Sequence, residues 1–347
     1  MAELVSLQRL VADGYHNAFT DLICWRGHYY LGYRHAQSHG IVPPGDVIIL
    51  RCADPTADDP NWQQVARFDT GGDDRDPKLL DAGDRLVVSF GTWVPRWRTS
   101  TSVTDVEHDL ITHIATTGDG TSWSTPRQVY GLNYWLWRLL AADGAYWCAA
   151  YHFGRRDDRD MRTVHLLRSE DLFDWRLITE MRSGGGPGEP VLYSPEPGVL
   201  HSVVRTLEPD HHSWLGISYE PYLHWDWHDL GAMIHAPVVL QTHDRRWIVA
   251  GRSQETDLPS GSYESVGEQH DSAGHHTSVW EINADGDSSG AQHLLTVPSG
   301  RDCSYSGLAP APDGRSILMS YYSQHERLPL PAQPPVPSDV YLAMMTL

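Results

Sequence analysis

The sequence predicts an all-β protein, a six-bladed β-propeller of four-stranded antiparallel blades. One strand–turn–strand unit occurs six times in 347 residues, and its copies begin about 50 to 70 residues apart, close to the length of one blade. The six units lie at 19–34, 77–92, 135–152, 190–205, 237–252 and 305–322. Because a propeller can hold this length in one repeated unit, residues 1–347 are expected to form a single domain. The inner strands of such a ring surround a central funnel, where functional residues are expected.

Each unit has the pattern of a β-hairpin whose first strand is apolar or alternating. A short turn rich in Gly or Asp joins the two strands, as at Asp143-Gly144 and Asp313-Gly314. Polar turns that precede a Trp mark the outer half of four blades, and they lie at 53–62, 116–123, 169–175 and 218–225. We expect these turns to join third and fourth strands and to be structural.

The last unit is followed by only one further strand, at 340–347. An apolar segment at 4–11 precedes the first unit and has no partner there. We therefore predict that this N-terminal strand pairs with the last blade and closes the ring. The long segments 93–109 and 253–276 are polar or aromatic and are expected to wall the funnel.

Composition excludes several kinds of partner. The formal net charge is −19 at pH 7 and no basic stripe is present, which argues against nucleic acid and anionic membrane surfaces. The aromatic residues are mostly 14 Trp and 16 Tyr, with only 5 Phe, so most of them carry a polar group. This composition suits a protein that binds carbohydrate.

No metal or other cofactor is expected. The four cysteines are far apart in the sequence with no CxxC pair, and no DxDxDG calcium loop occurs. Residues 1–14 lack a basic segment followed by an apolar run, and no stretch approaches 18 apolar residues. A cytoplasmic location is therefore the expectation.

Two segments, together with the outer turns, resemble the sialidase superfamily of six-bladed glycosidases. Residues 304–308 (Ser-Tyr-Ser-Gly-Leu), followed by Asp-Gly-Arg at 313–315, are similar to the sialidase segment that carries the catalytic Tyr. Residues 188–191 (Gly-Glu-Pro-Val) are similar to the segment with its partner Glu, and the following strand ends in Arg205. The outer turns resemble degenerate "Asp boxes" of that superfamily.

The resemblance implies an exo-acting glycoside hydrolase with Tyr305 as nucleophile and Glu189 as its base. Arg205 and Arg252 would then hold polar or anionic groups of the sugar. An unperturbed Tyr has a pKa near 10, so it needs a neighbouring carboxylate to accept its proton. A neutral Tyr also approaches an acidic sugar without the repulsion that a carboxylate nucleophile would meet.

The sequence departs from the sialidase pattern at two places. Sialidases open the first inner strand with Arg-Ile-Pro, but residues 16–21 here read His-Asn-Ala-Phe-Thr-Asp. The loop expected to hold the acidic general acid contains His39 instead. The substrate is therefore expected to be a terminal sugar that is acidic or otherwise unusual. The proton donor is His39 or another residue, and Arg138 is a candidate to replace the absent arginine.

Asp76 is the second candidate for the proton donor. The Arg75-Asp76-Pro77 segment opens the second unit and resembles the segment with which other propeller glycosidases hold a sugar and stabilise the developing cation. A carboxylate simply paired with Arg75 is the structural alternative. Further candidates for substrate binding stand at strand ends or beside them: Arg34, His16, Trp135, Tyr322 and His325.

Two other functions fit the same residues. A polysaccharide or oligosaccharide lyase acting on a uronate-containing glycan would use His16, His39 and Tyr305 as its acid–base set. A non-catalytic glycan-binding propeller is the third possibility, because a fold does not by itself determine activity.

Overall fold

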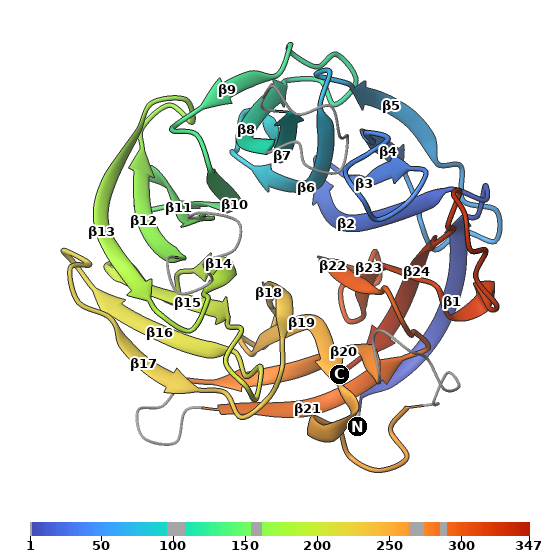
Figure 1. Ribbon diagram of the computed structural model, residues 1–347. Coiled ribbons are helices and arrows are strands. Elements are labelled where there is room, and N and C mark those ends of the chain that lie inside the picture. Colours follow the sequence, from blue (N-terminus) through green and yellow to red (C-terminus); the bar gives the residue numbers. More distant parts are fainter. Residues whose placement is uncertain (1, 96–107, 154–161, 264–273, 285–289) are drawn as a thin grey trace.

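The computed structural model describes residues 2–95, 108–153, 162–263, 274–284 and 290–347. These residues form six four-stranded antiparallel sheets arranged as a closed ring, as the sequence predicts (Figure 1). In the described residues, the helical elements among the strands are two 3-10 turns, η3 (Glu255–Asp257) and η5 (His325–Arg327). In the described part of the chain, no helix is long and apolar enough to cross a membrane.

The blades follow the order of the chain. Blade 1 contains β2 (His16–Trp25), β3 (His28–Ala36), β4 (Asp46–Cys52) and β5 (Gln63–Phe68). Blade 2 contains β6 (Asp73–Asp81), β7 (Leu86–Pro95), β8 (His108–Thr117) and β9 (Arg127–Val129). Blade 3 contains β10 (Tyr134–Ala142), β11 (Ala145–His152), β12 (Thr163–Ser169) and β13 (Trp175–Ser183).

The remaining blades follow the same plan. Blade 4 contains β14 (Gly188–Tyr193), β15 (Val199–Arg205), β16 (Trp214–Tyr219) and β17 (Asp226–Asp229). Blade 5 contains β18 (His235–Gln241), β19 (Trp247–Gln254), β20 (His275–Asn283) and β21 (Gly290–Val297). Blade 6 contains β22 (Ser304–Pro310), β23 (Ile317–Ser323), β24 (Asp339–Thr346) and, as its outer strand, β1 (Glu3–Val11).

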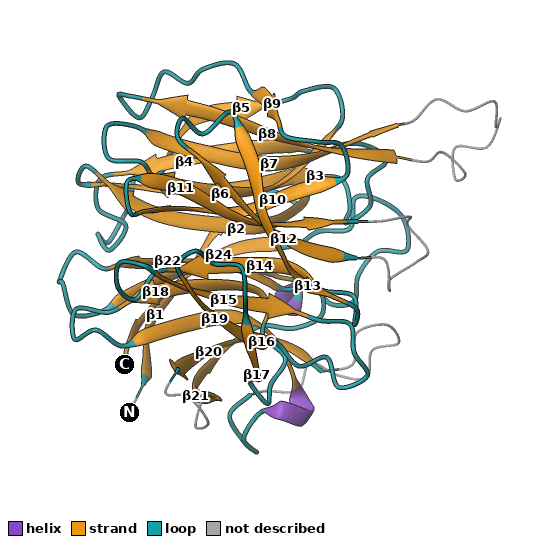
Figure 2. Ribbon diagram, turned by 90° about the vertical axis from the view of Figure 1, so that its left-hand side faces the viewer, coloured by secondary structure: helices purple, strands orange, loops and turns teal. Residues whose placement is uncertain are grey.

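The N-terminal strand closes the ring, which confirms the prediction made for residues 4–11. β1 pairs antiparallel with β24, with Leu7 opposite Ala343. Leu4 and Leu7 pack against the apolar core of the last blade. Figure 2 shows the ring from the side, with the two termini next to each other. The first and last strands of the chain therefore hold the same sheet together.

The hairpin turns explain why the inner strands pair as they do. Arg26-Gly27 and Asp143-Gly144 form two-residue loops in which both residues have positive φ, the geometry that matches the twist of paired strands. The four outer turns lie between third and fourth strands, as expected. Of the two segments expected to wall the funnel, residues 96–107 and 264–273 lie outside the described residues.

Large aromatic side chains fill the space between neighbouring blades. Between blades 1 and 2, Trp25 and Tyr30 join one apolar cluster with Phe68 and Phe90. Phe68 and Phe90 stack with their ring centroids 5.5 Å apart. At the junction of blades 6 and 1, a Cβ at Gly307 would lie 1.9 Å from the Leu22 nitrogen. Only glycine therefore allows β22 to approach β2 this closely.

Candidate active site

All six inner strands have a register shift near the start of the strand. The shifts leave one pair of residues unmatched in each strand, and the first residues of these pairs are Phe19, Asp76, Trp137, Glu189, Ala236 and Tyr305. We call these six residues the bulge set. Five of them have positive φ, from 46° at Glu189 to 58° at Phe19. Such bulges redirect side chains and are frequent at functional sites, since non-glycine residues adopt this conformation only at a cost.

The bulge set brings Tyr305 and Glu189 together at the centre of the ring. The Tyr305 hydroxyl donates a hydrogen bond of 2.7 Å to Oε1 of Glu189. The same carboxylate forms an ion pair with Arg205, and its Oε2 accepts a 2.9 Å hydrogen bond from the Ala236 backbone nitrogen. Three blades therefore fix the orientation of the Glu189 carboxylate.

The surroundings keep Tyr305 neutral. Burial raises the pKa of Tyr305 well above its ordinary value, and the Glu189 carboxylate raises it further, whereas Arg205 and Arg252 act in the opposite direction. Its ring lies 4.9 Å from the Phe19 ring and 5.9 Å from the Trp137 ring, measured between centroids. The carboxylate of Glu189 is the acceptor of the hydrogen bond that the phenol donates.

A second group of polar side chains is organised by Asp302. Its Oδ2 lies 2.9 Å from His16 Nε2 and 2.6 Å from His39 Nδ1. Its Oδ1 accepts hydrogen bonds from the Tyr322 hydroxyl at 2.6 Å and from Arg252 Nη2 at 3.2 Å. Arg252 also lies over the Tyr305 ring, 5.2 Å from its centroid, and this contact connects the two groups.

Asp302 is ionised in this setting. Burial alone would raise the pKa of Asp302, but its interactions with His39 and His16 hold it well below its usual range. Burial lowers the pKa of His16, so the His16 ring is neutral near pH 7. An ionised carboxylate only accepts hydrogen bonds, and both histidines therefore donate to it.

Arg34 and Arg75 donate to the loop that carries His39, a contact that the sequence did not predict. The Arg34 side chain is fully buried, and it donates to the carbonyl oxygens of Ser38 at 2.8 Å and Gly40 at 2.6 Å. Arg75 donates to the His39 carbonyl oxygen at 3.2 Å. Asp73 lies between the two guanidinium groups and accepts from both of them.

Asp76 and Lys78 are both buried on β6, and their charges interact with each other and with the Glu189 carboxylate. Burial raises the pKa of Asp76, the nearby Lys78 and Arg75 oppose this shift, and Glu189 adds to it. Oδ1 of Asp76 is buried and has no hydrogen-bond partner. The Lys78 ammonium lies 4.9 Å from the Trp137 ring centroid and 5.9 Å from that of Tyr305. Asp76 is therefore a buried acceptor with spare capacity beside the Tyr–Glu pair.

Three other predicted binding residues, Trp135, Arg138 and His325, make their main contacts away from the Tyr305–Glu189 pair and from Asp302. Trp135 is buried and stacks on Tyr151 at 5.9 Å, so the Trp that contacts Tyr305 is Trp137. In a regular strand Trp135 and Trp137 would share one face, but the register shift of β10 begins at Trp137.

Arg138 and His325 are engaged elsewhere. Arg138 donates to Asp21 Oδ1 at 2.9 Å and to the Ser306 carbonyl oxygen at 2.7 Å. It therefore connects β10 to blades 1 and 6. His325 Nδ1 lies 2.8 Å from Ser323 Oγ, and its ring packs on Tyr341, a residue of the third strand of its blade.

Sequence reasoning missed Asp302, Lys78 and Trp137. Asp302 precedes β22 by two residues, in a segment with no recognisable pattern, and its partners are distant in the sequence. Trp137 and Lys78 were available from alignment of the six units, because Trp137 occupies the same bulge position as Asp76 and Tyr305. The shared signal is the start of each inner strand, two or three residues before its apolar run.

Two groups of side chains have atoms close enough to hold a metal ion. His16, His39 and Asp302 form one group, and Asp210, His212 and Asp229 form the other at the surface. In the first group the carboxylate already accepts two hydrogen bonds on one oxygen, and Arg252 lies beside its other oxygen. The positive charge of Arg252 would repel a metal ion bound at that position.

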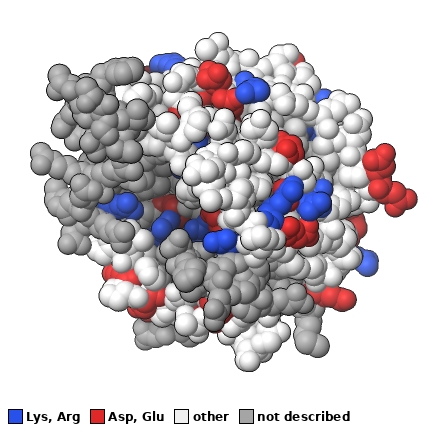
Figure 3. Space-filling model, turned by 45° about the vertical axis from the view of Figure 1, so that its right-hand side comes forward, with Lys and Arg blue, Asp and Glu red and all other residues white. Residues whose placement is uncertain are grey.

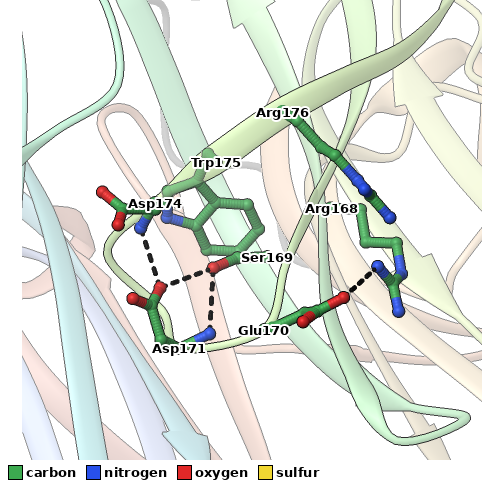
Figure 4. A pocket seen from close by; sticks show the side chains of 7 residues that line it. All are labelled: Arg168, Ser169, Glu170, Asp171, Asp174, Trp175 and Arg176. Atoms are coloured by element: carbon green, nitrogen blue, oxygen red, sulfur yellow. Dashed lines mark hydrogen bonds and ion pairs between the residues drawn. The ribbon is translucent and has the colours of Figure 1, made fainter.

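A surface pocket lies at the turn between β12 and β13, far from the bulge set in the fold. Figure 4 shows the turn: Asp171 Oδ1 accepts from the backbone nitrogen of Asp174 at 2.8 Å, and Ser169 Oγ accepts from that of Asp171 at 3.2 Å. The indole nitrogen of Trp175 donates to the Leu172 carbonyl oxygen at 2.7 Å. The side chains therefore satisfy the turn itself, as expected for a structural element.

Basic side chains gather on one face of the ring despite the negative net charge. Figure 3 shows Lys and Arg side chains in a row across the middle of this face, with acidic side chains beside several of them. Arg205 and Arg252 retain 22% and 13% side-chain exposure, whereas Arg34 retains none. Arg205, which pairs with Glu189, and Arg252, which contacts Tyr305, are thus both partly accessible.

No protein-family model matches the sequence. No curated protein matches it either. Among solved structures, a protein of unknown function from Dyadobacter fermentans superposes with a TM-score of 0.78 at 16% identity, covering 100% of this chain and 99% of that one.

Two sialidases also superpose on the chain. The phage phi92 endosialidase has a TM-score of 0.64 at 10% identity, with 99% of this chain and 69% of that chain covered. Trypanosoma rangeli sialidase, in a complex with 2,3-difluorosialic acid described as a covalent intermediate, has a TM-score of 0.61 at 12% identity. This chain is 99% covered there but spans only 59% of the trypanosomal chain. At these identities the likeness concerns the fold, and the protein has the sialidase-like six-bladed propeller fold.

Proposed function

We propose that this protein is an exo-acting glycoside hydrolase that cleaves a terminal sugar in the central funnel. The observation that carries the proposal is the 2.7 Å hydrogen bond from the Tyr305 hydroxyl to Glu189. A nucleophile joined to a base that other groups hold in place is the arrangement expected for covalent catalysis. The shared fold with sialidases supports the proposal as an analogy.

The proposed reaction has two steps. In the first, Glu189 takes the phenolic proton, the Tyr305 oxygen bonds to the anomeric carbon, and the bond to the leaving oxygen breaks. His39 or Asp76 supplies the proton that the leaving oxygen needs. In the second step, a water deprotonated by the same donor attacks the anomeric carbon, and Tyr305 recovers its proton from Glu189. Proton transfers of this kind contribute about 10²- to 10⁴-fold each.

Arg205 and Arg252 are the proposed contacts to the sugar. Both guanidinium groups retain partial exposure, and both lie against the Tyr–Glu pair through Glu189 and the Tyr305 ring. Cationic groups in a funnel attract anionic ligands even when the whole molecule is negative. We therefore propose that the substrate is a terminal sugar that is acidic or otherwise unusual.

A panel of 4-methylumbelliferyl glycosides tests the proposal. The panel contains neutral hexoses, deoxyhexoses, uronic acids and nonulosonic acids in both anomeric forms. Cleavage of at least one member is expected, and Tyr305→Phe and Glu189→Gln each lower kcat by about 10²- to 10⁴-fold. The midpoint of thermal unfolding of each variant should stay within a few degrees of the wild type, which separates lost chemistry from lost folding.

A fluorinated glycosyl fluoride of the cleaved sugar identifies the nucleophile directly. Fluorine beside the anomeric carbon slows hydrolysis of the covalent intermediate, so the intact mass should rise by one glycosyl unit. The modified peptide should contain Tyr305, and Tyr305→Phe should remain unmodified. If the label is found on another residue, the assignment of Tyr305 fails.

The remaining functions predict other results. An unsaturated uronate, detected by its ultraviolet absorbance on incubation with uronate-containing oligosaccharides, would show elimination and reject hydrolysis. Binding of a glycan without turnover of any panel member or oligosaccharide would favour a non-catalytic propeller.

A further inference from the structure

Two buried arginines, Arg34 and Arg75, hold the loop between β3 and β4 by hydrogen bonds to its backbone carbonyl oxygens. Arg34 binds the carbonyl oxygens on both sides of His39, at Ser38 and Gly40, and Arg75 binds the carbonyl oxygen of His39 itself. The side chain of Asp73, only 1% exposed, sits between the two arginines. Three successive carbonyl groups of one loop are therefore held by a buried ionic network.

A buried ionic network of this kind lowers the stability of the fold unless its interactions compensate for the desolvation of its charges. Removing two guanidinium groups and a carboxylate from water has a large desolvation cost, which their mutual attraction only partly offsets. The network positions a short loop whose central side chain, His39, remains 56% exposed. The consequence of this arrangement is a histidine with a fixed backbone and a ring that solvent or a ligand can reach.

The orientation of the His39 ring is set by a side-chain hydrogen bond to Asp302. Asp302 accepts a hydrogen bond from His39 Nδ1 at 2.6 Å, while His16, Tyr322 and Arg252 hold the same carboxylate. Because Nδ1 donates to Asp302, Nε2 is the nitrogen of His39 left for another partner. A carboxylate that orients a histidine in this way also stabilises the imidazolium form.

The rings of His39 and Tyr305 both contact the Phe19 ring, at 5.3 Å and 4.9 Å between centroids respectively. Arg252 contacts both the Tyr305 ring and Asp302. Asp76, by contrast, is buried and interacts electrostatically with Lys78 and Glu189, and its unpartnered oxygen suits a sugar hydroxyl. The two candidate donors therefore have different surroundings.

From this geometry we infer that His39 is the proton donor to the leaving oxygen and that Asp302 is its positioning residue. This inference rests on the proposed function. The imidazolium of His39 gives its Nε2 proton to the leaving oxygen as the bond to the anomeric carbon breaks. The neutral ring then takes a proton from the attacking water through Nε2, while Tyr305 leaves and receives its proton from Glu189. Protons and bonds balance over the cycle, and no further reactant is needed.

The dependence on the leaving group tests the role of His39. An alkoxide must be protonated to leave, whereas a dinitrophenolate leaves without a proton. With benzyl and 2,4-dinitrophenyl glycosides of the sugar that the wild type cleaves, His39→Ala should lose about 10²- to 10⁴-fold on the benzyl glycoside. The first step on the dinitrophenyl glycoside should slow less than about tenfold. Azide, which attacks the intermediate without a base, should restore turnover and yield a glycosyl azide.

Matched variants separate the proton donor from its neighbours. His35→Ala, which changes a histidine of the same β-hairpin that faces Asp13 and Tyr15, should leave both rates unchanged. Asp302→Asn should lower kcat for the benzyl glycoside with the same preference for the better leaving group, and with little change in KM. Tyr305→Phe should lose both substrates alike and should not respond to azide. If Asp76→Asn shows the leaving-group pattern and His39→Ala does not, the donor is Asp76 and the inference fails.

A spectroscopic measurement decides the orientation without any substrate. In protein labelled with ¹⁵N-histidine, the signals absent from His39→Gln belong to His39. These signals should show a proton on Nδ1 in a strong hydrogen bond, and Asp302→Asn should remove that feature. A proton on Nε2 alone would overturn the inference even if a glycoside is cleaved. Failure of the whole glycoside panel would instead reject the proposed function and the donor role with it.

Chelation tests whether the three side chains hold a metal ion instead. EDTA followed by gel filtration should leave the rates and the His39 signals unchanged, because the His–Asp contacts are hydrogen bonds. Loss of activity that zinc restores, together with a shifted His39 signal, would show a metal site and overturn the inference.

Discussion

Exposure separates two kinds of arginine among the charged residues of the funnel. Every donor-bearing group of Arg34 binds protein, with Nε on Asp73 and the terminal nitrogens on carbonyl oxygens and Asp73. Arg205 pairs with Glu189 but keeps part of its side chain accessible. A fully enclosed guanidinium stabilises a loop, and a partly open one can reach a ligand.

Arg34→Met should therefore affect stability first. The substitution leaves the buried Asp73 carboxylate with one partner fewer and releases the 38–40 loop, so the free energy of unfolding should fall by about 3 kcal/mol. Urea unfolding at pH 7 measures this loss. Arg85→Met, which removes an exposed pair with Asp84, should unfold at the same urea concentration as the wild type. Unchanged stability with a raised KM in Arg34→Met would return Arg34 to the substrate-binding residues.

At the scale of the strand, the repeated bulge is the device that builds the site. Each inner strand has one register shift near its start, and this shift determines which side chain points toward the centre of the ring. In five strands the residue at that step has positive φ, a conformation that costs a non-glycine residue roughly 1–2 kcal/mol. Stability is thus lost at the positions where Glu189, Asp76 and Tyr305 stand, as is common at functional sites.

Substitutions at Glu189 measure this backbone cost. Glu189→Gly and Glu189→Ala both remove the carboxylate, but Gly relieves the strain of φ 46°. The Gly variant should be more stable than the Ala variant by about 0.5–1 kcal/mol, since relief of strain exceeds the entropy that Gly loses on folding. This order is the reverse of that found inside regular strands. Urea unfolding of the two variants compares them, and a more stable Ala variant would mean that the bulge is not strained.

At the scale of the whole molecule, the ring encloses many histidines and keeps them neutral. Burial lowers the pKa of His201 to about 4, and burial also lowers the pKa of His16, His113, His235 and His275. A histidine whose pKa is depressed by folding contributes stability above its unfolded pKa near 6.5. This contribution is lost as the pH falls from about 6.5 toward the folded pKa.

Acid should therefore destabilise the propeller between pH 6.5 and pH 4. His201→Gln, which keeps an acceptor for the Tyr193 hydroxyl but cannot be protonated, should flatten this decline by up to about 1 kcal/mol per pH unit. Chemical unfolding at several pH values measures the slope. The exposed His224 serves as control, and His224→Gln should follow the wild-type slope. Equal slopes for all three proteins would show that His201 is not protonated on unfolding.

Much of the fold was predictable because its signals are local. Hairpin turns such as Asp143-Gly144 select their own geometry, and apolar strands of similar length recur along the chain. The unpaired strand at the N-terminus was identified because the last blade lacked a partner. Tyr305 and Glu189 were predicted through their resemblance to sialidase segments, and their hydrogen bond places them together.

By itself, the sequence determined the number of blades, the closure of the ring and the strand ends at which polar residues would face the axis. Apart from the Tyr305–Glu189 pair, which the resemblance implied, only the tertiary structure decided which of these residues meet. Asp302 lies 286 residues from His16 and 263 from His39. Local pattern carries no information about contacts over such separations. Whether an arginine binds a ligand or a carbonyl group depends on the path of a neighbouring loop, and that path is set by the packing of the closed ring.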